Sequence, residues 1–511
     1  MRTKNSALNM AVSLGGLFLN VLLQFMKRKI FLSFLSVEYL GVNGLFSEVL
    51  SMLSLVELGI GSAMIYSLYK PVADGDTGRI QQLMNLYRIL YRIVAIVVLI
   101  LGTALIPFLG ILIKGQPDIQ GLTFYYLLFL ANSVCSYLLS YKQSIIMANQ
   151  KAYINSAVFL GGAFVQCILQ ILVLVLTHNF TLYLLIQIGT SVLINVVLAV
   201  KADRMYPFLK ENRKMLPGKD ERKEIFKNVS AMAVHRAGSV AVHNTDNLLM
   251  SAFVGLISVG VYSNYSMIIS NLNNALNSVM GAFTAGIGNL GATESDGKVY
   301  ETYNTLNFFS FLVYGYCAVA LITLFNPFIS AFFGEQYLLS PATVFLIVLA
   351  FYLTGMRQIT LKFRDALGIF WYDRYKPVFE LAINLVASLI WVKKYGIAGI
   401  FAGTVFSTLA TSFWVDPYIL MRRGIKKEWK SRLAGYFFRY GVYTLSMAVV
   451  GGGIYLLCGN VPVSGYSGFF LKAILCTAGY NGIMFLLFAR TKEMKRLFVS
   501  VRQLLGGKKS A

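Results

Sequence analysis

Long apolar runs, each separated from the next by a short polar stretch, follow one another along the whole chain. Runs of about twenty residues are long enough to cross a bilayer as helices, whereas the strands of a membrane barrel would show alternating segments of about ten. The fold class that we predict is therefore an all-α polytopic membrane protein with about fourteen transmembrane helices. We expect them near 8–32, 40–66, 85–112, 121–147, 153–177, 180–202, 230–253, 259–290, 305–333, 341–361, 374–392, 396–420, 434–457 and 468–489.

The polar positions within these runs occur twice. An ordered series of similar residues recurs at offsets of 214 to 220: Gln24 with His243, Lys27 with Asp246, Gly41 with Gly260, Pro107 with Pro327, Val158-Phe159 with Val378-Phe379, and Gly189-Thr190 with Gly403-Thr404. Because each copy holds six helices, an even number, both copies enter the membrane from the same side. We expect a pseudo-two-fold axis along the membrane normal, with a substrate site between the halves near the midplane.

This repeat predicts the domain organisation. We expect an N-terminal six-helix half at 1–203, a linker at 204–229, a second six-helix half at 230–421, two extra helices at 422–490 and a basic tail at 491–511.

Composition and charge support a membrane protein and exclude a nucleic-acid-binding one. The chain has 511 residues, of which 57% are hydrophobic and only 13% charged, about half the charged fraction of a soluble protein. The net charge of +23 is concentrated in alternate loops, which is the positive-inside asymmetry and predicts that both termini are cytoplasmic. No compact basic module with interleaved aromatics lies outside the apolar runs. The first run is too long for a signal peptide and lacks an Ala-x-Ala site, so we expect it to be retained.

Polar side chains form stripes on several of the expected helices. In 8–32, Asn20, Gln24 and Lys27 fall within an arc of roughly 80°. The helix at 230–253 carries a stripe of its own, and the helices at 40–66 and 259–290 add further polar residues, of which the candidates are Arg236, His243, Asp246, Asn247, Glu57 and Asn264. A charge at the centre of a membrane helix costs about 2.5–3.5 kcal/mol, so each needs water, a partner or a ligand. The stripes predict a cavity with four polar walls.

The expected ligand of this cavity is an anion, because cations occur in both halves. Arg357 lies in the helix at 341–361, and a guanidinium suits phosphate oxygens through forked hydrogen bonds. Other interpretations stay open. Lys27 and Arg28 would also suit the end of a helix that reaches the headgroups, Arg236 would also reach cytoplasmic water, and Glu57 would also serve helix packing.

Motifs for catalysis and metal binding are absent from the sequence. There is no G-x-x-x-x-G-K-[ST] loop, and three histidines without carboxylate or cysteine spacing do not predict a zinc site. The five cysteines fall in expected helices or, for Cys458, directly at the end of one, without C-x-x-C spacing, and are interpreted as packing residues. We therefore expect no cofactor, no metal and no enzymatic activity, which leaves secondary transport.

Several stretches carry a resemblance to a known family. Tyr39-Leu-Gly-Val-Asn-Gly-Leu-Phe, the later Leu-Ser-Leu-Val-Glu57-Leu-Gly-Ile-Gly, and Val259-Gly-Val-Tyr-Ser-Asn-Tyr resemble the first and second copies of a signature of Wzx-type polysaccharide flippases. Arg364-Asp-Ala-Leu-Gly and Tyr395-Gly-Ile-Ala-Gly-Ile-Phe-Ala-Gly-Thr404 resemble later stretches. These flippases belong to the multidrug/oligosaccharidyl-lipid/polysaccharide exporter (MOP) superfamily, and the resemblance covers nearly the whole chain.

The resemblance implies a monomeric protein of the bacterial cell membrane that moves an undecaprenyl-diphosphate-linked oligosaccharide to the outer leaflet. Members use a cationic cavity, alternating access and an H+ or Na+ gradient or the membrane potential, and act beside glycan polymerase machinery. Lys27 or Arg28, with Arg236, would then contact the diphosphate and sugars. His243 and Asp246 depart from a purely cationic lining and would bind ligand or carry a coupling proton.

The residues expected to bind substrate are Asn20, Gln24, Lys27, Arg28, Arg236, His243, Asn247, Asn264 and Arg357, and those expected to couple an ion are Glu57 and Asp246. The alternatives are a drug or metabolite antiporter of the same fold, a flippase for a lipid II-type peptidoglycan precursor and, less favoured by the short outer loops, a membrane enzyme.

Overall fold

The structure is a computed structural model of the chain. It describes residues 2–505 except 58–59, 114–118, 120, 150, 211–214, 221, 224, 227–244, 282, 370–371, 373–374 and 462–464. Within these described ranges the chain consists of helices joined by turns and short loops, and contains no strand. The predicted all-α polytopic class is confirmed.

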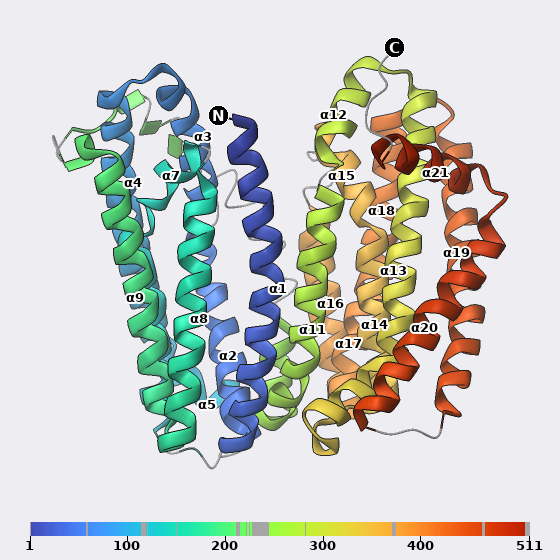
Figure 1. Cartoon of the computed structure of the whole chain (residues 1–511), viewed down its shortest axis with the longest axis horizontal. Helices are drawn as coiled ribbons and strands as arrows, with labels where there is room; N and C mark the ends of the chain where they lie inside the picture. The colour runs from blue at the N-terminus through green and yellow to red at the C-terminus, as the bar shows by residue number, and fades with distance from the viewer. Residues whose placement is uncertain are drawn as a thin grey trace. The chain divides into compact units, whose positions relative to one another are not determined.

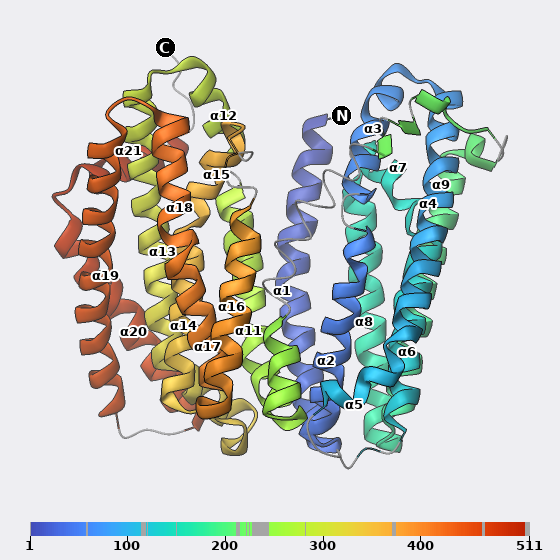
Figure 2. The ribbon, with the colours of Figure 1, turned by 180° about the vertical axis from the view of Figure 1, so that it is seen from behind.

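The chain forms two compact units, Met1–Gly260 and Val261–Ala511. The helices of the first unit, shown in Figures 1 and 2, are α1 (Arg2–Phe34), α2 (Val37–Leu53), η1 (Ser54–Glu57), α3 (Ile60–Asp74), α4 (Thr77–Ala104), η2 (Ile106–Phe108), α5 (Leu109–Leu112), α6 (Leu122–Ser140), α7 (Gln143–Ala148), α8 (Ala152–Thr177), α9 (Phe180–Met205), η3 (Pro207–Lys210) and a helical segment at 245–253.

A polar cap begins α4, and aromatic rings pack α1 against α9. The side chain of Asp76 accepts a hydrogen bond from the Arg79 backbone N–H at 2.8 Å, which satisfies an otherwise unpaired donor at the start of α4. α1 packs along α8, and α8 along α9. At the far end of α1 from Arg2, the ring of Phe31 meets the rings of Phe180 and Tyr183 edge to face.

Helix α11 (Leu256–Gly281) continues into the second unit. It is followed by α12 (Thr284–Thr293), α13 (Asp296–Phe332), η4 (Glu335–Tyr337), α14 (Pro341–Met356), α15 (Gln358–Ala366), α16 (Lys376–Tyr395), α17 (Ile397–Ala410), α18 (Ser412–Ile419), η6 (Leu420–Ile425), α19 (Trp429–Gly459), α20 (Gly465–Phe488) and α21 (Lys492–Leu505). The two helices that the repeat leaves over, α19 and α20, pack on the long α13 (Figure 2).

Nine helical stretches among the described residues are long and apolar enough to cross a membrane. Several expected spans are instead divided into shorter helices. The span expected at 40–66 consists of α2, η1 and α3, and the span expected at 341–361 consists of α14 and α15. Glu57 is the last residue of η1, and Arg357 is the single residue between α14 and α15.

One close crossing inside the first unit explains a repeated pair of glycines. A Cβ on Gly41 of α2 would overlap the carbonyl oxygen of Leu256, and a Cβ on Gly260 would overlap the carbonyl oxygen of Val37. The contact is reciprocal, because Val37 and Gly41 stand 219 positions before Leu256 and Gly260. Only glycine allows the two helix starts to approach this closely.

Candidate functional site

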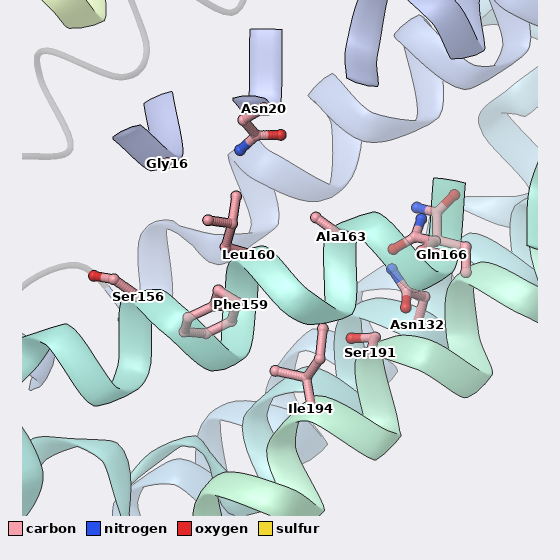
Figure 3. A pocket seen from close by; sticks show the side chains of 11 residues that line it. Gly16, Asn20, Asn132, Ser156, Phe159, Leu160, Ala163, Gln166, Ser191 and Ile194 are labelled. Atoms are coloured by element: carbon pink, nitrogen blue, oxygen red, sulfur yellow. The ribbon is translucent and has the colours of Figure 1, made fainter. Parts of the chain in front are cut away.

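The first unit contains a polar pocket of about 560 Å³ between α1, α6, α8 and α9. Figure 3 shows Asn132, Gln166 and Ser191 together at one side of it, with Asn20 and Leu160 at the other. The described lining residues are Gly16, Asn20, Asn132, Ser156, Phe159, Leu160, Ala163, Gln166, Gln187, Ser191 and Ile194, and none of them is charged. Of the residues predicted to bind substrate, Asn20 lies here.

Most polar side chains of this pocket have no partner in the described part of the chain. The Oδ1 atom of Asn132 is buried and accepts no hydrogen bond. The side chain of Gln166 donates weakly to Gln170 at 3.4 Å, and the buried Gln170 amide donates in turn to the Tyr183 carbonyl at 3.1 Å. Because buried polar groups are normally hydrogen-bonded, the unpaired Asn132 Oδ1 beside an open volume indicates space for a hydrogen-bonding ligand or water.

Two predicted cations lie further along α1. Lys27 is half-buried and faces Cys167 of α8, and no carboxylate among the described residues forms an ion pair with its ammonium. Arg28 is half-buried beside the Tyr183 ring of α9. Gln24, also half-buried, is engaged in a contact. These three predicted residues therefore lie within the first unit, at the level of α8 and α9.

Two carboxylates of the first unit are half-buried and hydrogen-bonded. Glu57 accepts a hydrogen bond from the hydroxyl of Tyr91 at 3.2 Å. Glu48 of α2, which the sequence analysis did not single out, accepts one from the Nδ2 atom of Asn247 at 3.3 Å. Asp246, beside Asn247, is half-buried and has an interaction of its own. Glu57 and Asp246, the residues predicted to couple an ion, thus lie in the first unit, as does Glu48.

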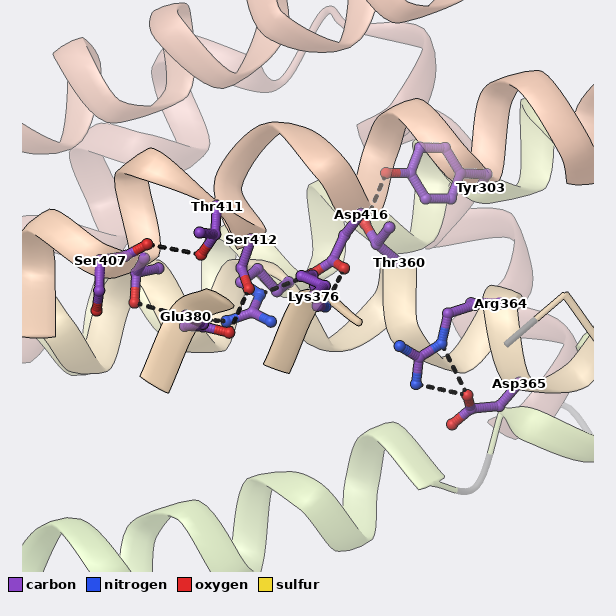
Figure 4. Close-up of polar contacts among 12 residues, drawn as sticks. Tyr303, Thr360, Arg364, Asp365, Lys376, Glu380, Ser407, Thr411, Ser412 and Asp416 are labelled. Atoms are coloured by element: carbon purple, nitrogen blue, oxygen red, sulfur yellow. Dashed lines mark hydrogen bonds and ion pairs between the residues drawn. The ribbon is translucent and has the colours of Figure 1, made fainter. Parts of the chain in front are cut away.

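The second unit contains a buried cluster of four charged side chains, shown in Figure 4. Arg357, at the break between α14 and α15, donates from Nε to Asp416 Oδ2 at 2.8 Å and pairs with Glu380 Oε1 at 3.4 Å. Lys376 pairs with the second oxygen of Asp416. The hydroxyl of Ser412 donates to Glu380 Oε2 at 2.6 Å. Two cations and two carboxylates therefore balance each other inside the helices, so Arg357 carries a neutralised charge.

A simpler version of this cluster occurs in the first unit. Lys142 lies at the break between α6 and α7 and pairs with Asp203 of α9 at 2.7 Å. Lys142-Gln143 and Arg357-Gln358 are equivalent, since each cation is the last residue before the short helix that follows. In each unit an ion pair thus links a helix break to a later helix. It links the break between α6 and α7 to α9 in the first unit, and the break between α14 and α15 to α18 in the second.

Other predicted residues lie apart from these groups. Asn264 of α11 is fully buried, and neither polar atom of its amide has a hydrogen-bond partner in the described chain. Arg236 and His243 lie outside the described residues.

Comparisons with known proteins identify the fold. No family model matches the chain, and no curated protein matches it. Among solved structures, the lipid II flippase MurJ in an inward closed conformation matches 94% of this chain and 99% of its own, with a TM-score of 0.61 and 12% identity. An inward-facing multidrug resistance transporter of the MATE family, in the MOP superfamily, matches 80% of this chain and 96% of its own, with a TM-score of 0.61 and 16% identity.

The chain has the fold of MOP-superfamily transporters. A MOP-superfamily transporter from Pyrococcus furiosus, described as having a binding pocket of reverse polarity, also matches, with a TM-score of 0.55, 14% identity and coverage of 83% of this chain and 97% of its own. These matches show the fold of a multi-pass membrane protein. Neighbours at this level of identity do not specify the substrate.

Sequence reasoning found one residue of each group, Asn20 of the pocket and Arg357 of the ionic cluster, and missed the others. Asn132, Gln166 and Gln187 resemble ordinary helix-packing amides when each is considered alone. Glu380 and Asp416 carried a usable signal, because a carboxylate within an apolar run needs a partner. The partner itself comes from another helix, which sequence spacing does not show.

Proposed function

We propose that this chain is a flippase that moves a polyprenyl-diphosphate-linked oligosaccharide from the inner to the outer leaflet of the bacterial cell membrane by alternating access. The observation that carries the proposal is the Lys27 ammonium, half-buried on α1 without a carboxylate partner among the described residues. A buried cation that the protein does not neutralise is suited to an anion that arrives and leaves. A diphosphate supplies such an anion.

The contrast with the second unit supports this assignment. There Arg357 and Lys376 are both neutralised by carboxylates, so they have less attraction left for an anionic ligand. Lys27 has no carboxylate partner among the described residues, so it retains its attraction for an anion. In this proposal Arg236 and His243 contribute to the same site, and Glu57 and Asp246 couple transport to an ion gradient.

Transport in proteoliposomes tests the proposal. A fluorescent polyprenyl-diphosphate disaccharide is placed in both leaflets, and the fraction exposed to an external quencher is followed with time. We expect wild-type protein to accelerate its movement between leaflets. Lys27→Gln should slow it by about 10- to 100-fold, because a hydrogen bond to a charged group is worth about 1.5–3 kcal/mol.

The matched control is Lys29→Gln, which removes an exposed cation two residues along the same helix and should leave the rate unchanged. Arg236→Ala should also abolish movement while leaving folding and membrane insertion intact. Wild-type protein that moves no polyprenyl-diphosphate glycan would overturn the proposal.

A second candidate, an ion-coupled exporter of cationic compounds, is favoured by one observation. The half-buried carboxylates Glu48 and Glu57 resemble groups that exchange a proton for a cation. The same vesicles, loaded with a fluorescent cation under a proton gradient, distinguish the two. Efflux that depends on Glu57, without glycan-lipid movement, would favour the exporter.

A further inference from the structure

The polar pocket of the first unit has a composition that the recognition of a diphosphate does not explain. Asn20, Asn132, Gln166 and Gln187 supply amide donors and acceptors, and Ser156 and Ser191 supply hydroxyls. No charged side chain is among the described residues that line it. A pocket for phosphate would be expected to include Lys or Arg, and one for a cationic compound to include a carboxylate.

The equivalent place in the second unit shows what this pocket lacks. The repeat aligns Val158-Phe159 with Val378-Phe379, so Ser156 stands where Lys376 stands and Leu160 where Glu380 stands. Likewise, the match of Gly189-Thr190 with Gly403-Thr404 puts Ile194 where Thr408 stands. In the second unit these positions belong to the ionic cluster. The first unit has neutral side chains and an open volume at the same positions.

Groups that make no hydrogen bond to the protein point to a ligand. Asn132 Oδ1 is buried without a donor, and the exposed Asn20 and the half-buried Gln187 add further amides to the lining. Gly16 adds no side chain to the lining, and a Cβ there would lie in ordinary van der Waals contact with Leu160, at 3.6 Å. Phe159 adds an aromatic ring to the lining.

The chemistry that matches this lining is a neutral carbohydrate. A sugar ring offers hydroxyls that both donate and accept, which amide side chains can match from several sides, and apolar C–H faces that suit an aromatic ring. At about 560 Å³, the pocket falls within the usual range of about 300–1,000 Å³ for small-ligand sites.

We propose that this pocket binds an uncharged sugar unit of the transported glycan. The inference rests on the proposed function, since it assigns the glycan to the pocket and the diphosphate to Lys27. Asn20 and Lys27 are seven residues apart on α1, which corresponds to about 10 Å along the helix axis. Sugar and diphosphate are therefore recognised by separate parts of one helix.

Binding of two lipids by the purified full-length protein separates the two contributions. The probes are polyprenyl diphosphate alone and polyprenyl diphosphate carrying a neutral disaccharide, each titrated in detergent micelles. For wild-type protein we expect the disaccharide to increase affinity. In Asn132→Leu the affinity for the disaccharide lipid should fall by about five- to tenfold, the effect of one hydrogen bond. Affinity for the sugar-free lipid should stay unchanged, which also shows that the variant is folded.

Asn481→Leu is the matched control. Asn481 is an exposed residue of α20 whose amide donates only to the Thr477 carbonyl of its own helix, so its replacement should change neither affinity. Lys27→Gln should give the converse of Asn132→Leu and weaken both lipids equally.

Two results would overturn the inference in different ways. Suppose that wild-type protein binds both lipids. If Asn132→Leu and Gln187→Leu leave the affinity for each lipid unchanged, or lower the two affinities equally, the pocket does not recognise sugar, although the proposed function stands. If wild-type protein binds neither lipid, the proposed function fails as well. Binding of a cationic dye that Gln187→Leu removes would reassign the pocket to cationic compounds.

Discussion

The two units differ in charge at equivalent positions of the repeat. In the second unit, Lys376 and Glu380 of α16 join Arg357 and Asp416 in a closed, charge-balanced cluster. In the first unit, the residues of α8 that correspond to Lys376 and Glu380 in the repeat are Ser156 and Leu160, and both line a neutral pocket. The second unit therefore has ion pairs at the positions where the first unit has a pocket.

This difference shows which part of the repeat is structural. The pair of a cation at the helix break with an aspartate of the sixth span occurs in both units, as Lys142 with Asp203 and as Arg357 with Asp416. A feature kept in both copies is best explained by the fold that they share. Lys376 and Glu380 have no charged counterparts in the first unit. These two residues, and the pocket at the corresponding positions of the first unit, are where the units have diverged.

The largest expected effect comes from breaking the balanced cluster. Asp416→Ala would leave Arg357 and Lys376 buried with only Glu380 to neutralise them, and removal of one partner from a buried ion pair costs about 3–5 kcal/mol. Asp203→Ala in the first unit should cost less, about 1–3 kcal/mol, because its pair with Lys142 is partly exposed. Thermal unfolding in detergent measures both. Equal losses would contradict the assigned difference between the units.

The next effect concerns the glycines at which the two copies remain alike. Gly41→Ala and Gly260→Ala each place a Cβ against a backbone carbonyl, so the helices must separate. We expect each to destabilise the protein by about 1–3 kcal/mol, the usual cost of overpacking. Gly161→Ala is the control, since a Cβ there meets nothing within 4 Å. If only one of the two glycines tolerates alanine, the crossing is not reciprocal.

Exchanging charged residues for their neutral counterparts gives a smaller effect. Lys376→Ser and Glu380→Leu each leave the cluster with an unbalanced charge, whereas the double variant keeps Arg357 paired with Asp416. We therefore expect the double variant to lose less stability than the sum of the two single losses, and less than about 2 kcal/mol in total. Unfolding midpoints of all three variants provide the test, and strict additivity would argue against a single coupled cluster.

The apolar runs predicted the all-helical class well, because a run of about twenty apolar residues can cross a bilayer only as a helix. They missed the helix breaks: a 3-10 turn at Glu57 and a break at Arg357 are tolerated through tertiary partners, Tyr91 in one case and Asp416 in the other. The repeat identified Gly41 and Gly260 as equivalent, and the structure adds the carbonyl contacts that require glycine.

The candidate site was less predictable. A stripe on one helix pointed to Asn20 and Lys27, but the pocket also needs Asn132, Gln166 and Gln187 from three other helices. Each of these amides is an ordinary residue in its own helix. Only packing of α1, α6, α8 and α9 brings them around one volume, and that packing depends on long-range contacts rather than on local pattern.

The smallest effect distinguishes two phenylalanines at equivalent positions of the repeat. Phe159 lines the polar pocket, whereas Phe379 of α16 is 63% exposed and borders no described pocket. If a sugar ring stacks in the pocket, Phe159→Ala should slow movement of the disaccharide lipid by roughly threefold, which corresponds to about 0.7 kcal/mol of lost aromatic contact. Phe379→Ala should leave the rate unchanged. Since both variants remove the same side chain from the fifth span of a repeat, a general effect of losing an aromatic ring would slow both equally. A selective loss at Phe159 would assign glycan contact to the first unit.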